Sequence, residues 1–418
     1  MGAAEKQTLF STTLGCVADF QNGGAWKESE YVDSGVPVTR VTNCQSGTVD
    51  LSGCKYLSFS SAKKYERHRL IKGDLIVATV GSHPTQPGSV VGRTSTVPES
   101  ASGSLLNQNA VRLRAKSGLL DQRYLTYLAS SKEFRDYIIA HARGAASQVR
   151  MSIELLRDMP LLLPPLPTQQ LVASFLSVYD DLIENNMRRI EILEEMARRL
   201  YEEWFVQFRF PGHEEVGFKE SELGLIPEGW GVTELEEVVH LTMGQSPSSE
   251  FYNEVGEGLP FHQGVTGFGD YFPSNKSYCT IEARVANEGD ILFSVRAPVG
   301  RINVAKEKIV IGRGVSALRS KTDHQIFLLS QLRCIFKEED SMGNGAIFKA
   351  VTKKDMQSIK LLQPSAEVIE RFELIAAPLW RLIRILSDKN TNLSKQRDLL
   401  LPKLIAGEID VSDIPMPT

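Results

Sequence analysis

The stretch from residue 164 to residue 206 has the apolar spacing of one long helix, and it constrains the fold more than any other part of the chain. Three prolines between 164 and 167 exclude a helix before Thr168, a suitable N-cap. We therefore expect the helix to begin near Gln169 and to end before Pro211. The apolar positions recur every three or four residues: Leu171, Phe175, Val178, Leu182, Ile190, Leu193, Ala197, Leu200 and Trp204. At 1.5 Å per residue the helix spans about 60 Å, and such a stripe requires a packing partner.

A second apolar stripe, displaced by 200 positions, predicts that partner. Leu361-Leu362 stands just before Pro364 as Leu161-Leu162 stands just before Pro164. The same displacement aligns the leucines at 182 and 382, 193 and 393, and 200 and 400. We expect the two helices to pack antiparallel as a coiled coil. The residues predicted to pack between them are Phe175, Leu182, Leu193, Leu200, Trp204, Phe372, Leu379, Leu382, Leu386, Leu393, Leu400 and Leu404. Asn186 and Asn390 interrupt the stripes, with a register-fixing role and a solvated position both open, and Pro378 predicts a kink.

The segments outside the helices also repeat, which predicts two similar globular domains. Gly73-Asp74-Leu75-Ile76 corresponds to Gly289-Asp290-Ile291-Leu292, and each pair of Gly and Asp indicates a tight turn before a buried strand. The sequence Ala110 to Arg114 corresponds in the same way to Val315 to Arg319. Short apolar runs that indicate strands occur at 36–38, 75–80, 90–91 and 110–113, and the clearest helix runs from 121 to 142. A shared framework with different loops predicts one scaffold that presents two surfaces.

The predicted fold class is α+β, with two similar mixed α/β domains separated by two long antiparallel helices. The helices form a coiled coil, and the halves are related by a pseudo-two-fold internal repeat. The predicted boundaries are 1–163 for the first domain, 164–210 for the first long helix, 211–229 for a linker, 230–363 for the second domain, 364–406 for the second long helix and 407–418 for a C-terminal tail.

Composition and charge narrow the class of protein. A hydrophobic fraction of 42% and a charged fraction of 23% are typical of globular proteins. There is no apolar run of about 18 residues and no signal-like N-terminus, so we expect a soluble, cytoplasmic protein with no membrane partner. Five scattered cysteines predict reduced core thiols, with no disulfide framework and no metal site. Residues 1–160 carry 19 lysines and arginines against 14 acidic residues, which permits polyanion binding, whereas residues 228–363 carry 15 against 17.

Motifs at the helix ends carry a family resemblance. The first helix opens with Pro164-Pro165-Leu166-Pro167-Thr168-Gln169-Gln170, and it closes with the stretch from Met196 to Val206 and then Phe208-Arg209-Phe210-Pro211-Gly212. Residues 399–409, LLLPKLIAGEI, end the second helix. Together with the order domain, helix, domain, helix, these motifs resemble the specificity subunit of type I restriction-modification systems over nearly the whole chain. The second helix departs from the pattern, because Pro364-Ser365-Ala366-Glu367 replaces the Pro-Pro-Leu opening.

This resemblance implies that each globular domain is a target recognition domain that reads one half of a bipartite target on double-stranded DNA. Half-sites about one helical turn apart, roughly 34 Å, suit two such readers. The resemblance also implies that the chain has no catalysis and binds no cofactor. The implied partners are two methylation subunits and motor-nuclease subunits, on which S-adenosylmethionine, ATP and Mg²⁺ are expected.

The sequence shows no GxxxxGK[ST] phosphate loop, no NPPY-like methyltransferase motif, no HExxH and no GxSxG. An enzyme with an unfamiliar site is therefore disfavoured. The alternative to DNA recognition is a coiled-coil scaffold that binds protein partners, with globular domains that bind other ligands and have no DNA specificity.

Polar side chains on the predicted loops are candidate DNA contacts, because Arg and Lys suit guanine whereas Asn and Gln suit adenine. The candidates in the first domain are Arg40, Thr42, Asn43, Lys63, Lys64, Arg67, Arg69, Ser82, His83, Gln86, Ser147, Gln148 and Arg150. Those in the second domain are Gln245, Ser246, His262, Gln263, Arg296, Arg301, Arg313, Lys349 and Lys353. For each of them a solvated position or a phosphate contact is the alternative interpretation.

Overall fold

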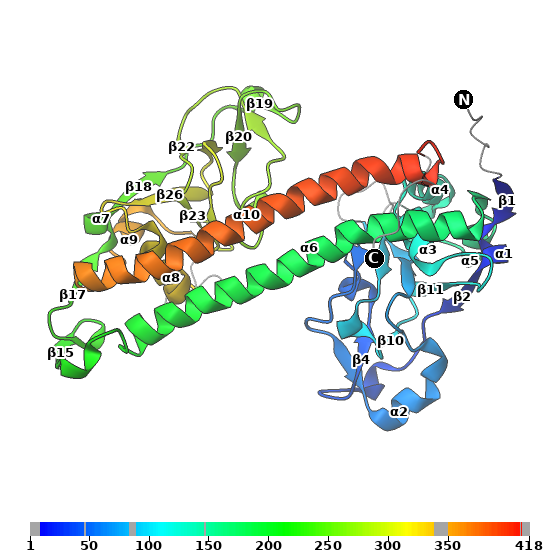
Figure 1. Ribbon diagram of the computed structural model, residues 1–418, viewed down its shortest axis with the longest axis horizontal. Coiled ribbons are helices and arrows are strands. Elements are labelled where there is room, and N and C mark those ends of the chain that lie inside the picture. The colour runs from blue at the N-terminus through cyan, green and yellow to red at the C-terminus, as the bar shows by residue number, and fades with distance from the viewer. Residues whose placement is uncertain are drawn as a thin grey trace. The chain divides into compact units, whose positions relative to one another are not determined.

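The computed structural model describes residues 9–45, 47–82, 89–145, 148–337, 350–409 and 411, without the side chains of 143–145 and 148. The chain divides into two compact units (Figure 1). Unit 1 comprises Met1–Asn185 and Lys389–Thr418, and unit 2 comprises Asn186–Asp388. Each unit contains one globular domain and a part of each long helix, α6 (Leu166–Tyr201) and α10 (Ala366–Ile405).

The domain of unit 1 is built on two sheets, with strand orders β2-β11-β7-β9-β5 and β10-β4-β6-β3. Their strands are β2 (Ala18–Asn22), β3 (Tyr31–Val32), β4 (Val36–Thr39), β5 (Gly47–Thr48), β6 (Lys55–Leu57), β7 (Leu75–Ala78), β9 (Thr94–Thr96), β10 (Leu105–Leu106) and β11 (Ala110–Ala115). All four residues of β7 are buried, as predicted for the strand after the Gly-Asp turn. The strand indicated at residues 90–91 is wrong, because Val91 packs into the core from a turn.

Helices and short strands complete unit 1. They are β1 (Phe10–Thr13), α1 (Leu14–Val17), α2 (Phe59–Lys64), β8 (Val80–Gly81), α3 (Gln122–Ala129), α4 (Lys132–His141), β12 (Arg143–Ala145), β13 (Gln148–Arg150), α5 (Ile153–Arg157) and β14 (Pro160–Leu163). The single helix predicted over residues 121–142 is wrong, because it is divided into α3 and α4. The hydroxyl of Ser131 accepts a hydrogen bond from the backbone of Phe134 at 3.2 Å, so it caps a new helix.

The domain of unit 2 also has two sheets, with strand orders β18-β26-β23-β24 and β19-β21-β20-β25-β22. Their strands are β18 (Val239–Met243), β19 (Tyr252–Asn253), β20 (Leu259–His262), β21 (Tyr278–Cys279), β22 (Val285–Ala286), β23 (Ile291–Ser294), β24 (Ile302–Val304), β25 (Ile309–Ile311) and β26 (Val315–Ser320). The remaining strands and short α-helices are β15 (Phe218–Ser221), β16 (Gly224–Pro227), β17 (Gly231–Glu234), α7 (Leu235–Val238), α8 (Gln325–Ile335), α9 (Lys353–Gln357) and β27 (Lys360–Gln363).

The two domains share an ion pair between a buried aspartate and a partly exposed arginine next to the Gly-Asp turn. In unit 1, Arg114 of β11 donates to Asp74 with an Nη2–Oδ2 distance of 2.8 Å. In unit 2, Arg319 of β26 donates to Asp290 with an Nε–Oδ1 distance of 2.6 Å. Each aspartate also accepts the backbone N–H of the residue three positions earlier, at 2.8 and 2.6 Å. The carboxylate therefore closes the turn and the arginine neutralises it, which explains why these residue types recur in both halves.

Helix α6 begins at Leu166, three residues before the predicted start at Gln169, and it includes Pro167. Proline is tolerated there because the N–H that it lacks would have no acceptor in the first turn. The helix continues as a π-helix over Glu202–Val206 and ends before Pro211, as predicted. Helix α10 continues through Pro378 without interruption, and the kink at that residue stays a prediction.

Within unit 2 the long helices pack through aromatic side chains. Phe372 of α10 is fully buried, and its ring centroid lies 6.2 Å from that of Trp204 and 5.2 Å from that of Phe205. Ile190, which precedes Trp204 in the chain, shares a core cluster with Leu386, which follows Phe372. Late residues of α6 thus meet early residues of α10, which confirms the antiparallel arrangement within this unit (Figure 1).

Within unit 1 polar contacts join the same two helices. Arg397 of α10 donates to Asp180 of α6 with an Nη1–Oδ1 distance of 2.5 Å. Asn390 is partly buried and donates to the carbonyl oxygen of Ile183 at 3.4 Å. This contact between the helices favours the register-fixing role for Asn390 over the solvated position.

The predicted packing residues differ in burial. Leu182 does not fit the prediction, because it is 46% exposed. The other eleven are buried or partly buried. The stripe also missed Trp380 and Ile383, which lie in the unit 2 core. A helical stripe identifies an apolar face, but domain side chains cover part of that face in place of the partner helix.

No helix among the described residues is long and apolar enough to cross a membrane. The same residues contain no group of three or more His, Cys, Asp or Glu side chains that could hold a metal ion. All five cysteines are free thiols. Cys44 and Cys279 are buried, but the predicted core position is wrong for Cys16, which is exposed.

Candidate nucleic-acid interface

Loops from four strands meet at one edge of the unit 2 domain. Ser246 follows β18, Gln263 follows β20 and Arg313 precedes β26. The hydroxyl of Ser246 donates to Oε1 of Gln263 at 3.0 Å and accepts from the backbone N–H of Arg313 at 3.1 Å. Gln245 and Arg296, which follows β23 beside β26, are exposed, as are Gln263 and Arg313. We call these five residues the unit 2 edge.

Close backbone approach holds the unit 2 edge together. The N–H of Gly244 donates to the carbonyl oxygen of Val315 at 3.0 Å, and a Cβ on Gly244 would overlap the carbonyl oxygen of Gly312. The N–H of Gly314 donates to the carbonyl oxygen of Gln263 at 3.0 Å. Because glycine has no Cβ, three loops can approach closely enough to present their side chains on one surface.

The other unit 2 candidates lie elsewhere. Arg301 is partly buried, and its backbone N–H donates to the hydroxyl of Ser294 at 2.8 Å. Lys353 is exposed at the first position of α9. Lys349 lies outside the described residues.

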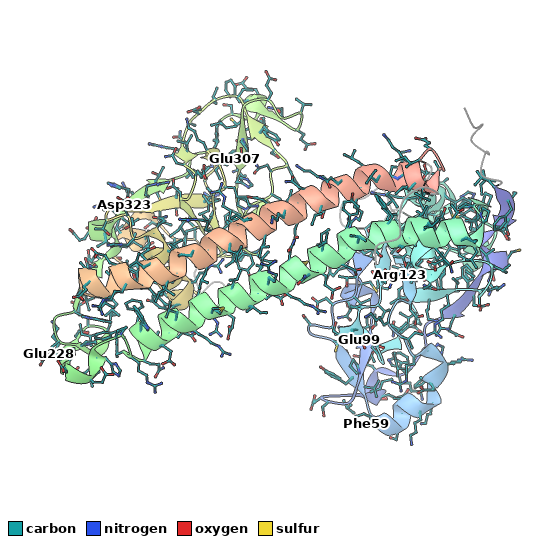
Figure 2. The ribbon with its side chains drawn as sticks, viewed as in Figure 1. Phe59, Glu99, Arg123, Glu228, Glu307 and Asp323 are labelled. Atoms are coloured by element: carbon teal, nitrogen blue, oxygen red, sulfur yellow. The ribbon has the colours of Figure 1, made fainter. Side chains whose placement is uncertain are left out.

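His262 is a buried structural residue, which corrects its assignment as a DNA contact. It is 4% exposed, and its Nε2 lies 3.0 Å from Oδ1 of Asn275. The amide nitrogen of Asn275 donates to Glu307 at 2.8 Å, and Glu307 is labelled in Figure 2. Burial lowers the pKa of His262, and the hydrogen bond with Asn275 opposes part of that shift. The folded protein therefore favours the neutral imidazole.

This burial predicts a dependence of stability on pH. The pKa of His262 is lower in the folded chain than the unfolded value of about 6.5, so the unfolded chain binds the proton more readily. The stability from neutral His262 is thus present above about pH 6.5 and is lost as the pH falls below it. We expect the urea midpoint to fall between pH 7.5 and 5.5, and to fall less in His262→Gln. The exposed His240→Gln should behave like the parent, and an equal fall in all three would contradict the assignment.

Unit 1 forms an edge with the same backbone hydrogen bonds. The donor and acceptor residues in unit 1 are Gly23 and Ala110, Asn107 and Thr39, and Thr79 and Asn109, at 3.0, 3.0 and 2.9 Å. The corresponding pairs in unit 2 are Gly244 and Val315, Gly312 and His262, and Val295 and Gly314, at 3.0, 2.9 and 3.0 Å. The duplicated framework therefore extends from the strands into the loops that present polar side chains.

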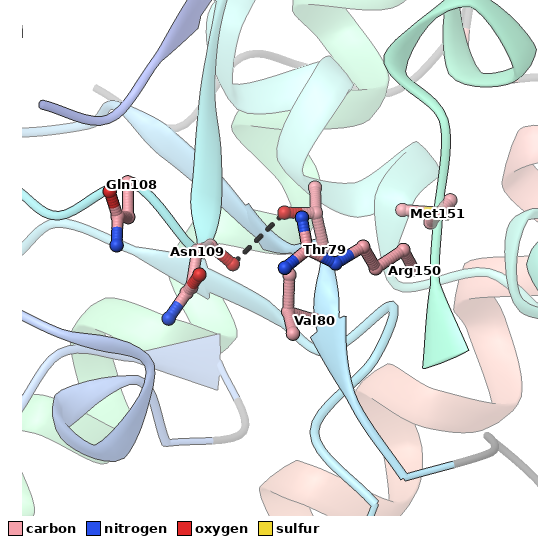
Figure 3. Close-up of a pocket in the computed structure, with 6 residues that line it drawn as sticks. All are labelled: Thr79, Val80, Gln108, Asn109, Arg150 and Met151. Atoms are coloured by element: carbon pink, nitrogen blue, oxygen red, sulfur yellow. Dashed lines mark hydrogen bonds between the residues drawn. The ribbon is translucent and has the colours of Figure 1, made fainter. Parts of the chain in front are cut away.

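A pocket of about 300 Å³ opens at this edge of unit 1 (Figure 3). It is lined by Thr79, Val80, Gln108, Asn109, Arg150 and Met151. The hydroxyl of Thr79 donates to the carbonyl oxygen of Asn109 at 3.0 Å, which ties β7 to the turn before β11. Gln108 and Arg150 are exposed. Arg40 follows β4 as Gln263 follows β20, and we call Arg40, Gln108, Asn109 and Arg150 the unit 1 edge.

The sequence analysis missed Gln108 and Asn109. Both precede Ala110, the first residue of the segment that was matched to Val315–Arg319. The run Asn107-Gln108-Asn109 in front of that shared strand was the available signal. The internal repeat does not reveal this run, because the two halves share residue types in the apolar strand but not in the turn before it.

Several candidates in unit 1 are held by the fold. Asn43 is 4% exposed and donates to the carbonyl oxygen of Asp50 at 3.0 Å, so its assignment as a base contact is corrected to a structural role. Arg69 donates to both oxygens of Glu66, at 2.7 and 2.8 Å, and to the carbonyl oxygen of Gly103 at 2.5 Å. These bonds occupy its guanidinium, so Arg69 also braces the fold.

Other candidates in unit 1 are accessible. Thr42, Lys63, Lys64 and Arg67 are exposed. Arg67 borders a second pocket together with Gly23, next to the unit 1 edge. Arg40 is partly buried, and one of its terminal nitrogens donates to the carbonyl oxygen of a loop glycine at 3.3 Å.

Most of the remaining unit 1 candidates for DNA contact lie outside the described residues. Ser82 is partly buried, and its carbonyl oxygen accepts from the hydroxyl of Ser89 at 2.6 Å. His83, Gln86 and Ser147 lie outside the described residues, as does the side chain of Gln148.

Comparison with known proteins gives consistent results. The model of the type I restriction modification DNA specificity domain matches residues 11–195 and 227–393. The MjaX chain of Methanocaldococcus jannaschii, provisionally named a type I restriction enzyme specificity subunit, is 31% identical over 381 residues, covering 90% of this chain and 88% of that protein. The MjaIX type I restriction enzyme specificity subunit of the same organism is 26% identical over 320 residues, and the alignment covers 74% of this chain and 73% of the MjaIX protein.

A solved structure shares the fold. The S subunit of a type I restriction-modification system from M. genitalium aligns with a TM-score of 0.58 at 16% identity, covering 97% of this chain and 98% of its own. The family match covers both domains and most of the two helices, and each domain presents the same polar edge. The chain belongs to the family of type I restriction modification DNA specificity proteins.

Proposed function

We propose that this chain reads a bipartite target on double-stranded DNA, with one half-site for each domain. The observation that supports this function best is the pair of edges. They have the same backbone hydrogen bonds but different side chains at equivalent positions: unit 2 has Arg313 in place of Gln108 and Gln263 in place of Arg40. A shared framework gives both edges the same reach into a groove, and different side chains give them different sequence preferences.

The charges of the unit 1 domain suit this role. Arg40, Lys63, Lys64, Arg67 and Arg150 lie on one domain, and none of the salt bridges among the described residues involves them, although Lys64 interacts electrostatically with Glu30. Cations of this kind contact phosphates and give affinity that falls with salt, whereas the amides of the edge supply base contacts.

We further propose that the chain is a non-catalytic subunit. The absence of nucleotide, methyltransferase and hydrolase motifs from the sequence supports this assignment. In such an assembly this chain would bring two methylation subunits and motor-nuclease subunits to the target. S-adenosylmethionine, ATP and Mg²⁺ would be bound by those subunits and not by this chain.

Exchange of a whole domain tests the reading of half-sites. Replacing residues 12–160 by the same segment of another family member should change one half of the recognised sequence and leave the other half intact. The full chain would be expressed with its methylation subunit, and the methylated adenines would be mapped by sequencing. Exchange of residues 230–363 is the matched control and should change only the other half.

A change of both halves, or of neither, in these exchanges would contradict the assignment of one half-site to each domain. Footprinting of the parent complex separates DNA reading from the scaffold alternative. Two short protected sites with a spacer between them support DNA reading, and no protected pair would support the scaffold.

A further inference from the structure

Equivalent four-residue turns stand at the centre of the two edges. In unit 1 the turn is Asn107-Gln108-Asn109-Ala110, and in unit 2 it is Gly312-Arg313-Gly314-Val315. In each turn the N–H of the last residue donates to the carbonyl oxygen of the first, at 3.3 Å in unit 1 and 3.0 Å in unit 2. The first and third residues of each turn are tied to neighbouring loops by the hydrogen bonds described above. The second position is therefore equivalent in the two units: Gln108 in one and Arg313 in the other.

The side chains at this second position are accessible. Gln108 is exposed, and its amide has no hydrogen-bond partner among the residues that the structure describes. Arg313 is exposed, and Nε lies 3.4 Å from the hydroxyl of Ser246. That contact leaves the two terminal nitrogens of Arg313 without a protein acceptor in the described part of the chain. One turn therefore presents an amide and the other presents a guanidinium from the same place.

A cation accompanies each turn from a different strand. In unit 1 Arg150 precedes Met151, whose N–H donates to the carbonyl oxygen of Thr79 at 2.9 Å. In unit 2 Val351 makes the equivalent bond to Val295, also at 2.9 Å, and the residue before Val351 is an alanine. Unit 2 instead carries Arg296 directly after Val295, where unit 1 has a valine after Thr79. Each edge thus has an exposed arginine beside the turn, and a guanidinium at that place is suited to a phosphate while the turn itself is suited to a base.

We propose that the second residue of this turn reads one base pair in each half-site, with Gln108 selecting adenine and Arg313 selecting guanine. An amide can pair with N6 and N7 of adenine, whereas a guanidinium can pair with O6 and N7 of guanine in the major groove. The inference rests on the proposed function, because it requires that the two edges contact DNA. It assigns bases to equivalent positions in the two half-sites.

Reciprocal substitutions at the turn test this assignment. The full chain is expressed with its methylation subunit, and the binding of duplex libraries and the methylated sequences are measured. Gln108→Arg should change one adenine of the first half-site to guanine and leave the second half unchanged. Arg313→Gln should change one guanine of the second half-site to adenine. One bidentate contact corresponds to a preference of roughly 5- to 150-fold for the selected base.

Further variants guard against loss of folding and against effects of charge alone. Gln108→Ala removes the amide without adding charge, and it should relax selection at the same single position. Ser102→Arg adds the same charge at an exposed site of unit 1 that lies outside the edge, and it should leave the sequence unchanged. Arg371→Gln removes an exposed arginine of α10 that pairs with Glu367, and it should also leave the sequence unchanged.

Three results would overturn the inference. If Gln108→Arg and Arg313→Gln change affinity equally for all sequences, the turn contacts phosphate and reads no base. The parent complex could select a bipartite sequence that neither Gln108→Arg nor Gln108→Ala alters. In that case the base is read elsewhere, and the proposed function stands. A parent complex with no bipartite sequence would instead overturn the proposed function, and this inference with it.

Discussion

Phe372→Ala is expected to lower the free energy of unfolding by about 3–5 kcal/mol. The side chain is fully buried, and its ring lies in contact with those of Tyr201, Trp204, Phe205 and Phe327, at centroid separations between 5.2 and 6.2 Å. Removing the ring leaves a cavity between rigid aromatic groups that cannot collapse to fill it. Urea unfolding monitored by tryptophan fluorescence measures the effect, because Trp204 belongs to the same cluster.

The control for this substitution is Phe59→Ala on α2 of unit 1. Phe59 is 73% exposed and is labelled in Figure 2. Its loss should change the free energy of unfolding by no more than about 0.5 kcal/mol. If the two variants lose similar stability, the aromatic cluster does not hold the helices together in unit 2.

Gly244→Ala is expected to abolish selection of the second half-site, and Gly23→Ala that of the first. A Cβ at Gly244 would overlap the carbonyl oxygen of Gly312, and a Cβ at Gly23 would overlap that of Asn107. Both obstacles are backbone atoms, so the turn carrying Arg313 or Gln108 must shift. Overpacking of this kind costs about 1–3 kcal/mol, and a displaced turn loses its base contact as well.

Gly231→Ala is the control for both variants, because the nearest atom to its Cβ would be in ordinary contact at 3.9 Å. The methylated sequence of each variant shows which half is lost. We expect each edge variant to retain the opposite half, since the affected turns belong to separate units. If Gly244→Ala weakened both halves equally, its effect would be a general loss of stability and not a local displacement of the turn.

Most of the architecture could be predicted from local patterns. The apolar stripes predicted both long helices, and the repeated Gly-Asp pairs predicted the buried strands β7 and β23. The errors arose where local chemistry interrupts a pattern. Ser131 caps a new helix inside an apparently continuous one, and Leu182 lies on the stripe but faces solvent. Periodicity shows which residues share a face, but it does not show what covers that face.

Candidate contacts were harder to predict, because residue type does not reveal burial. His262 and Asn43 have suitable groups for base contacts, yet both are buried and hydrogen-bonded within the fold. Gln108 and Asn109 lie at the edge without any motif of their own. The same polar side chain can form hydrogen bonds within the fold or with a ligand. Only its burial and its neighbours in the folded structure distinguish the two roles.

The sequence by itself determined the duplicated halves, the long helices and the strands after the Gly-Asp turns. The helices and strands depend on spacing between residues close together in the chain, which a helix or strand period records directly. The duplication shows as the same residue types recurring about 200 positions later in the chain. Only the tertiary structure decided which loops form each edge. Ser246, Gln263 and Arg313 come together because glycine backbones from separate strands pack closely, and no local period encodes an approach between distant segments.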